Sequence, residues 1–166
     1  MLTTEPKTVA DVMTRRLVTG REDDVIADID DAMHRLRVRH MPVIDEKGTL
    51  VGLLSHPDLL HAAASFLSDR EADQNALVNQ VPVGRIMQRE VLTVEPSDSL
   101  VEAGKLMWDA KLGCLPVVES DGKLVGIITE ADFIAVVVEL LGGEIKKSDV
   151  EELARTPKTA RARLAM

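Results

Sequence analysis

Residues 42–58 read PVIDEKGTLVGLLSHPD, and residues 116–132 read PVVESDGKLVGIITEAD. The two stretches agree at an offset of 74 positions, and the agreement extends outward over residues 9–60 and 83–134 without a gap. In each stretch two short apolar runs surround a turn that contains a glycine, which is typical of a β-hairpin. The internal repeat therefore predicts two copies of one structural unit.

Each copy is predicted to fold as strand, helix, strand, strand, helix. The helix ahead of each hairpin carries apolar residues at helical spacing, which indicates one buried face. Asp24 and Asp98 lie where the N-caps of these two helices are expected. The apolar positions are Ile26, Ile29, Met33 and Leu36 in the first copy and Leu100, Ala103, Met107 and Ala110 in the second.

The predicted fold class is therefore α/β, in the α+β sense, with two tandem β-α-β-β-α repeats. We place the first repeat at residues 8–64, a linker with a helix end and a polar loop at 65–81, the second repeat at 82–138 and a C-terminal segment at 139–166. Gly142 and Gly143 are expected to end a helix, and Ser148 with Glu151 forms a capping-box pattern that begins an extra C-terminal helix. The basic residues after it favour a solvated tail over a docking arm.

Composition argues against several classes of function. The chain has 166 residues, a net charge of −8 and three aromatic side chains, so it repels phosphate backbones and has few rings on which bases could stack. The longest apolar stretch is about nine residues, whereas a membrane-spanning helix needs about 20. A single cysteine and the lack of a signal-peptide pattern favour the cytoplasm. We expect neither nucleic acid nor a membrane as a partner.

The repeated order of Pro-Val, acid, turn Gly, Leu-Val-Gly, Ser or Thr and then Asp, preceded by an amphipathic helix and a V-x-x-V/I-M opening, resembles the CBS domain family. The chain looks like a stand-alone pair of such domains, known as a Bateman module. The resemblance implies that the repeats pack as one pseudo-twofold module. It also implies that clefts between them bind AMP, ADP, ATP, NAD or S-adenosylmethionine, with Mg²⁺ as a companion of the phosphates and no catalytic cofactor.

The resemblance assigns a ribose-binding role to two acids and a sugar or phosphate contact to two hydroxyls. A carboxylate can accept hydrogen bonds from both ribose hydroxyls, with charge-assisted strength. The same Ser-x-x-Asp and Thr-x-x-Asp patterns can also cap the following helix, and the two roles are compatible. The residues concerned are Asp58 and Asp132 for the ribose, and Ser55 and Thr129 for the hydroxyls.

The resemblance also implies an adenine region and a phosphate region. Arg39 and His56 are the candidate phosphate contacts, although Arg39 could equally be a surface arginine and His56 a surface histidine at a capped helix. The second copy has Gly113 and Cys114 where the first has Arg39 and His40, so the two clefts are expected to differ for phosphates. The candidates near the adenine are Thr19, Thr93, Val38, His40, Met41, Cys114 and Leu115, for which a place in the core is the alternative.

We predict neither a catalytic residue nor a metal ligand. His34, His40, His56 and His61 form no recognised zinc pattern, and one cysteine supplies no structural thiolate site. Cys114 precedes a buried strand, which favours an inert small hydrophobic residue over a nucleophile.

The expected function is that of a regulatory module that senses an adenine nucleotide and signals to an unidentified protein. The last helix of each copy is apolar on more than one face, which predicts a homodimer, with burial under the C-terminal helix as the alternative. A constitutive dimeric scaffold with vestigial clefts is the alternative function.

Overall fold

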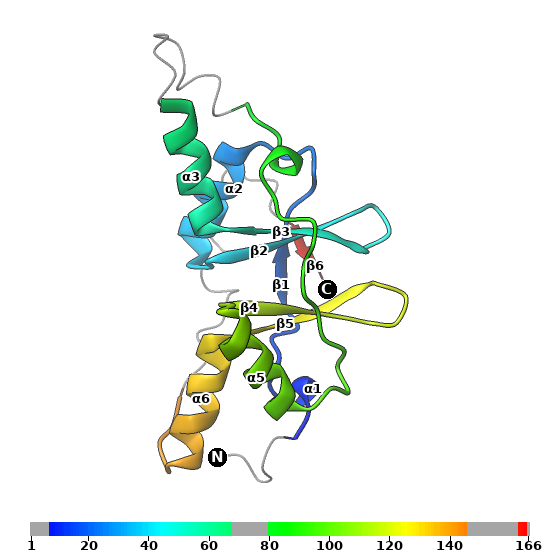
Figure 1. The fold of residues 1–166 in the computed structure, drawn as a ribbon, viewed down its shortest axis with the longest axis vertical. Helices are drawn as coiled ribbons and strands as arrows, with labels where there is room; N and C mark the ends of the chain where they lie inside the picture. The colour runs from blue at the N-terminus through cyan, green and yellow to red at the C-terminus, as the bar shows by residue number, and fades with distance from the viewer. Residues whose placement is uncertain (1–6, 68–79, 146–162, 166) are drawn as a thin grey trace. The chain divides into compact units, whose positions relative to one another are not determined.

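A computed structural model of the chain describes residues 7–67, 80–145 and 163–165 (Figure 1). The predicted helix that begins after Ser148 lies outside the described residues, as does most of the predicted linker. The described residues form two compact units. One comprises residues 18–67, 80–91 and 163–165, and the other comprises residues 7–17 and 92–145.

The unit that begins at Val18 contains the first hairpin. Its elements, drawn in Figure 1, are β1 (Leu17–Thr19, whose first residue belongs to the other unit), α2 (Ile26–Leu36), β2 (His40–Ile44), β3 (Leu50–Ser55), α3 (His56–Leu67) and the 3₁₀ turn η1 (Val83–Arg85). Gly20, directly after β1, forms a parallel bridge with Val43 of β2. A short strand near the C-terminus, β6 (Arg163–Ala165), pairs with β1. The core is built from α2, the hairpin, α3 and η1.

The unit that begins at Leu92 repeats this arrangement around the second hairpin. Its elements are α1 (Val9–Val12), α5 (Leu100–Ala110), β4 (Cys114–Val118), β5 (Leu124–Thr129) and α6 (Glu130–Leu140). Where the first copy has β1, this unit has a single parallel bridge between Val94 and Val117. The predicted end of the last helix is confirmed, because α6 ends at Leu140 and Gly142 follows with φ +85°.

The two hairpins have one register. In the first, Met41 pairs with Leu54 and Val43 with Gly52, and the matched residues of the second pair in the same way. Both carry an irregularity at the same place, between Val43 and Ile44 or their counterparts. The turns contain Gly48 at φ +84° and Gly122 at φ +83°, a conformation that residues with a Cβ avoid. The predicted hairpins are therefore confirmed.

The two amphipathic helices are confirmed, but their predicted N-caps are wrong by one residue. Val25 and Ser99 occupy the N-cap positions of α2 and α5. The Asp24 carboxylate instead accepts a hydrogen bond from the Arg21 amide, 2.8 Å away, and that of Asp98 does the same for Glu95. Each aspartate therefore stabilises the turn before the helix. Its carboxylate accepts a hydrogen bond from that turn and lies one residue before the N-cap position.

The segment that opens each sequence copy packs in the compact unit of the other copy. Thr8 and Thr14 form antiparallel bridges with Ser99 and Ile127. In the other unit Pro82 and Gln88 form the matched bridges with Val25 and Leu53. Each hairpin and its helices are therefore completed by the segment that opens the other copy of the sequence.

Within the described residues, no helix is both long and apolar enough to cross a membrane.

Candidate functional site

The Ser-x-x-Asp and Thr-x-x-Asp motifs form the junctions between β3 and α3 and between β5 and α6. The Ser55 amide donates to Oδ2 of Asp58 at 2.8 Å, and the Thr129 amide donates to Oδ2 of Asp132 at 2.9 Å. The hydroxyl groups of Ser55 and Thr129 donate to the same oxygens. Both carboxylates thus hold the first turn of a helix, and the capping role that we considered for these motifs is confirmed.

The two carboxylates differ in exposure. Asp58 is half-buried, and its second oxygen, Oδ1, accepts a hydrogen bond from the side-chain amide of Gln88 at 3.2 Å. Asp132 is buried, with 7% of its surface exposed. Gln88 comes from the segment that opens the second copy of the sequence and packs in the unit of the first, which we call the exchanged opening segment. Thr14 occupies the matched position in the other unit. Gln88 therefore belongs to the site of Asp58, although the sequence of the first copy alone could not have predicted this.

The start of β2 lies beside the first junction. His40 pairs with Ser55 across the hairpin, and the His56 amide donates to the Arg39 carbonyl at 3.0 Å. Arg39 itself is exposed. The structure thus brings the segments of both candidate phosphate residues together at the N-terminus of α3, where the helix dipole favours an anion.

The second junction has the same backbone but different side chains. Cys114 pairs with Thr129, and the Glu130 amide donates to the Gly113 carbonyl at 3.2 Å. Glu130 therefore stands where the first copy has His56, and Gly113 where it has Arg39. The backbone of the two sites is alike, whereas the first carries basic groups and the second an acid.

The candidate adenine residues divide by burial. Val38, His40 and Thr93 are half-buried, so part of each remains exposed in its unit. Thr19 and Cys114 are 3% and 4% exposed, and Met41 and Leu115 are fully buried. These four can offer a ligand mainly their backbone groups within each unit as described. All seven residues lie on or beside β1, β2 and β4 or the segment that leads to Val94.

Burial raises the pKa of the Cys114 thiol to about 12, and the nearby negative charge of Glu130 acts in the same direction. The thiol is therefore protonated at neutral pH and is a poor nucleophile.

Comparison with known proteins identifies the family. The CBS domain matches residues 9–65 and again residues 83–139, so the chain belongs to the CBS domain family. A CBS domain-containing protein of Dictyostelium discoideum is 29% identical over 134 residues, which cover 80% of this chain and 92% of that protein. A homoserine O-acetyltransferase of Methanococcoides burtonii is 36% identical over 124 residues, which are 75% of this chain but only 23% of that enzyme.

Solved structures with the same fold include two that contain adenine nucleotides. CBSX2 of Arabidopsis thaliana in complex with AMP has a TM-score of 0.70 and 30% identity, covering 82% of this chain and 99% of that one. The cytosolic domain of the Mg²⁺ channel MgtE in complex with ATP has a TM-score of 0.63 and 30% identity. That match covers 78% of this chain and 48% of the MgtE chain.

Proposed function

We propose that the chain is a regulatory module that binds an adenosine-containing ligand at the two strand-to-helix junctions. Membership of the CBS domain family and the similarity to structures that contain AMP and ATP support an adenine nucleotide as the ligand. The family that matches is the CBS domain, and the stretch shared with the acetyltransferase is only 23% of that enzyme. We therefore propose a binding role without catalysis.

The observation that carries the proposal is the matched pair of held carboxylates, Asp58 and Asp132. In each, Oδ2 is fixed by the amide and hydroxyl of the residue three positions earlier. A carboxylate held in this way loses little further freedom when it accepts the hydroxyls of a ribose. Each aspartate would then both cap its helix and accept hydrogen bonds from the ribose. The hydroxyl of Ser55 or Thr129 would lie beside the sugar.

The differences between the copies favour phosphates at the first junction. Arg39 and His56 can supply positive charge there, whereas Glu130 places negative charge at the second. Charge-assisted hydrogen bonds to phosphate are roughly twice as strong as neutral ones, and a like charge opposes binding. ATP should therefore prefer the site of Asp58, and an adenosine ligand without phosphates should prefer the site of Asp132. Mg²⁺ would accompany only the polyphosphate ligands.

For the remaining partners we propose a homodimer, formed through the last helices, and a protein whose binding changes with the ligand. Such regulation requires the ligand to bind two arrangements of the module with different affinity. The cytoplasmic location stays a prediction. The alternative is a constitutive dimeric scaffold whose ligand sites are vestigial.

Calorimetry on the nucleotide-free protein tests the proposal, with AMP, ADP, ATP, NAD and S-adenosylmethionine as ligands and with EDTA present to remove metal ions. Native mass spectrometry of the protein as purified detects any ligand that it retains. We expect saturable binding of at least one of these ligands. Absence of binding by all five, together with absence of a retained nucleotide, would overturn the proposal in favour of the scaffold.

A further inference from the structure

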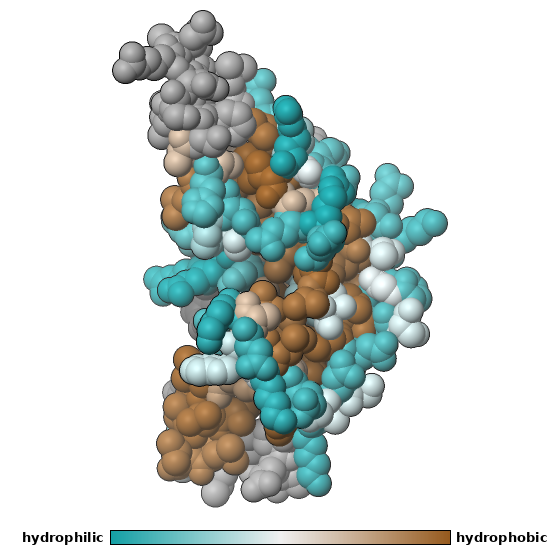
Figure 2. All heavy atoms as spheres, viewed as in Figure 1, coloured by the Kyte–Doolittle hydropathy of each residue, from teal (hydrophilic) through white to brown (hydrophobic). Residues whose placement is uncertain are grey.

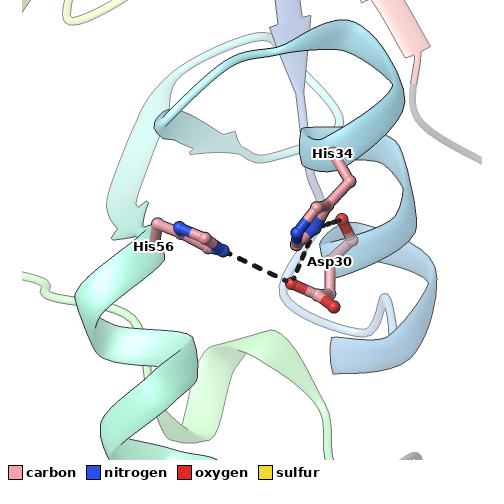
Figure 3. Close-up of side chains that lie close together, drawn as sticks. All are labelled: Asp30, His34 and His56. Atoms are coloured by element: carbon pink, nitrogen blue, oxygen red, sulfur yellow. Dashed lines mark hydrogen bonds and ion pairs between the residues drawn. The ribbon is translucent and has the colours of Figure 1, made fainter.

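Two histidines and an aspartate from two different helices meet on one face of the unit that begins at Val18. Asp30 and His34 lie on α2, and His56 is the first residue of α3 (Figure 3). Oδ1 of Asp30 lies 3.4 Å from Nδ1 of His34 and 3.9 Å from Nε2 of His56. One possible ligand atom from each residue lies within 4.8 Å of the other two.

We propose that Asp30, His34 and His56 bind a divalent first-row transition-metal ion, of which Zn²⁺ is the best match. Two imidazoles and one carboxylate are a ligand set that suits Zn²⁺, Co²⁺ or Ni²⁺ and does not suit Mg²⁺, which prefers oxygen ligands alone. Three protein ligands leave a fourth tetrahedral position for water. The site shares His56 with the proposed phosphate contacts of the first junction but includes neither of the ribose-binding acids.

The distances fit coordination by small side-chain movements. Metal–nitrogen and metal–oxygen bonds of about 2.1 Å in a tetrahedral arrangement place neighbouring ligand atoms about 3.4 Å apart. Nε2 of His56 lies 3.9 Å from Oδ1 of Asp30, and one ligand atom of His34 lies within 4.8 Å of both residues, so rotation of the exposed side chains has to bring the set together. The imidazole rings lie edge to face, at 77°, with centroids 5.1 Å apart, so they approach the carboxylate from different directions.

A hydrogen bond prepares His34 as a ligand. Its Nδ1 lies 3.1 Å from the backbone carbonyl of Asp30, one turn earlier on α2. A carbonyl can only accept, so this bond requires the proton on Nδ1 and leaves the lone pair of Nε2 free for a metal. Bonds of this kind between the second imidazole nitrogen and a carbonyl are usual for metal-binding histidines.

The backbone holds the third ligand independently of any metal. The position of His56 follows from the register of the hairpin and from the bond between its amide and the Arg39 carbonyl. Asp30 and His34 share one face of α2 because they are four residues apart. The side chains are 47% exposed for Asp30, 62% for His34 and 38% for His56, so solvent and ions reach them and the core does not depend on them.

The second copy shows that the fold does not need this cluster. The matched residues there are Gly104, Trp108 and Glu130, which offer one carboxylate and no imidazole. A Cβ on Gly104 would lie 3.0 Å from the ring of Phe133, so this helix contact is filled by an aromatic ring instead. The cluster is thus a property of the first copy, added to a helix pair that forms without it.

Zn²⁺ titration of the full chain, purified without a histidine tag and competed against a chromogenic chelator, tests the proposal. We expect one Zn²⁺ per chain, and an affinity at least about tenfold lower in each of His34→Gln, His56→Gln and Asp30→Asn. Co²⁺ in place of Zn²⁺ should give the visible absorption of a tetrahedral site, and this absorption should be lost in the same variants.

His61→Gln is the matched control, because His61 is exposed on α3 and is not part of the cluster. It should bind Zn²⁺ as the unaltered protein does. The proposal is overturned if the unaltered protein binds no Zn²⁺, or if His61→Gln weakens binding as much as His34→Gln. Because the nucleotide titrations are done in EDTA and the Zn²⁺ titrations without nucleotide, either proposal can fail alone.

Discussion

The sulfur atom of Met87 occupies the space that a Cβ atom on Gly52 would need, since the two would be 2.5 Å apart. Met13 stands in the same relation to Gly126, also at 2.5 Å. In both units the methionine comes from the exchanged opening segment, and the glycine is that of the Leu-Val-Gly run in the hairpin. The glycine thus leaves room for the segment to lie against the sheet.

Gly52→Ala should destabilise its unit by about 1–3 kcal/mol, the usual cost of overpacking. The added methyl group would also lie 3.0 Å from the Gln88 carbonyl, which is backbone and cannot turn aside. Gly126→Ala meets only side-chain atoms of Met13 and should cost less. Urea unfolding of both variants measures the difference. An equal loss in the two variants would contradict the role of the Gln88 backbone.

The Met87–Gly52 contact also marks the limit of what the sequence could predict. The hairpins, the amphipathic helices and the end of α6 follow from local patterns of apolar residues and glycines, and the structure agrees with them. The exchange of the opening segments does not, because Val9 to Met13 and Val83 to Met87 carry the same pattern and each would fit either sheet. Similarly, His34 and His56 are 22 positions apart, and only the packing of α2 against α3 brings them together.

Asp58→Asn and Asp132→Asn should each weaken one class of nucleotide binding by at least about tenfold. Asparagine keeps a side-chain oxygen that can accept from the Ser55 or Thr129 amide, but it loses the charge that strengthens a bond to the ribose. Calorimetry measures the affinity, and thermal unfolding shows whether the cap survives.

Asp11→Asn is the control for those variants. Asp11 forms a capping box with Thr8 at the start of α1 and accepts from the Thr8 amide at 2.9 Å, but it is not one of the proposed ligand residues. It should leave nucleotide affinity unchanged. If Asp58→Asn and Asp132→Asn together bind as the unaltered protein does, both acids are caps only and the ribose assignment is wrong.

Gln88→Ala should strengthen binding at the first site by about two- to fivefold. The Gln88 amide donates to Oδ1 of Asp58 at 3.2 Å, and a ribose hydroxyl that approaches this oxygen must share or replace that bond. The second site has Thr14 at the position matched to Gln88, so ligand binding there should not change in Gln88→Ala. Weaker binding in Gln88→Ala would mean that the amide itself contacts the ligand.

Val137→Glu should convert the proposed homodimer into a monomer. Hydrophobic side chains cover α6 in Figure 2, and Ile134, Val137, Leu140 and Leu141 are between 53% and 83% exposed. A buried, unpaired charge costs several kcal/mol, so the dissociation constant should rise at least about 100-fold. Sedimentation analysis measures it, with Val101→Glu on α5, where Val101 is 64% exposed, as the control. An unaltered protein that is monomeric, or a Val137→Glu dimer of unchanged affinity, would contradict this interface.

The buried thiol of Cys114 should make the protein less stable at high pH. Its pKa in the folded state is raised to about 12 from an ordinary value of 9.0, so between these values the unfolded chain has lost a proton that the folded chain keeps. Stability therefore falls as pH rises above about 9, by about 1.4 kcal/mol per pH unit, and is unaffected below it. The pKa values of Lys105 and Lys123 are also raised, by hydrogen bonds to Glu102 and Asp121, and act in the same direction. The informative quantity is therefore the free energy of unfolding of the unaltered protein minus that of Cys114→Ser, measured with urea from pH 8 to 11, which should fall as pH rises. A difference that is constant over this range would show that the thiol has the same pKa in the folded and unfolded chain, so that burial does not raise it.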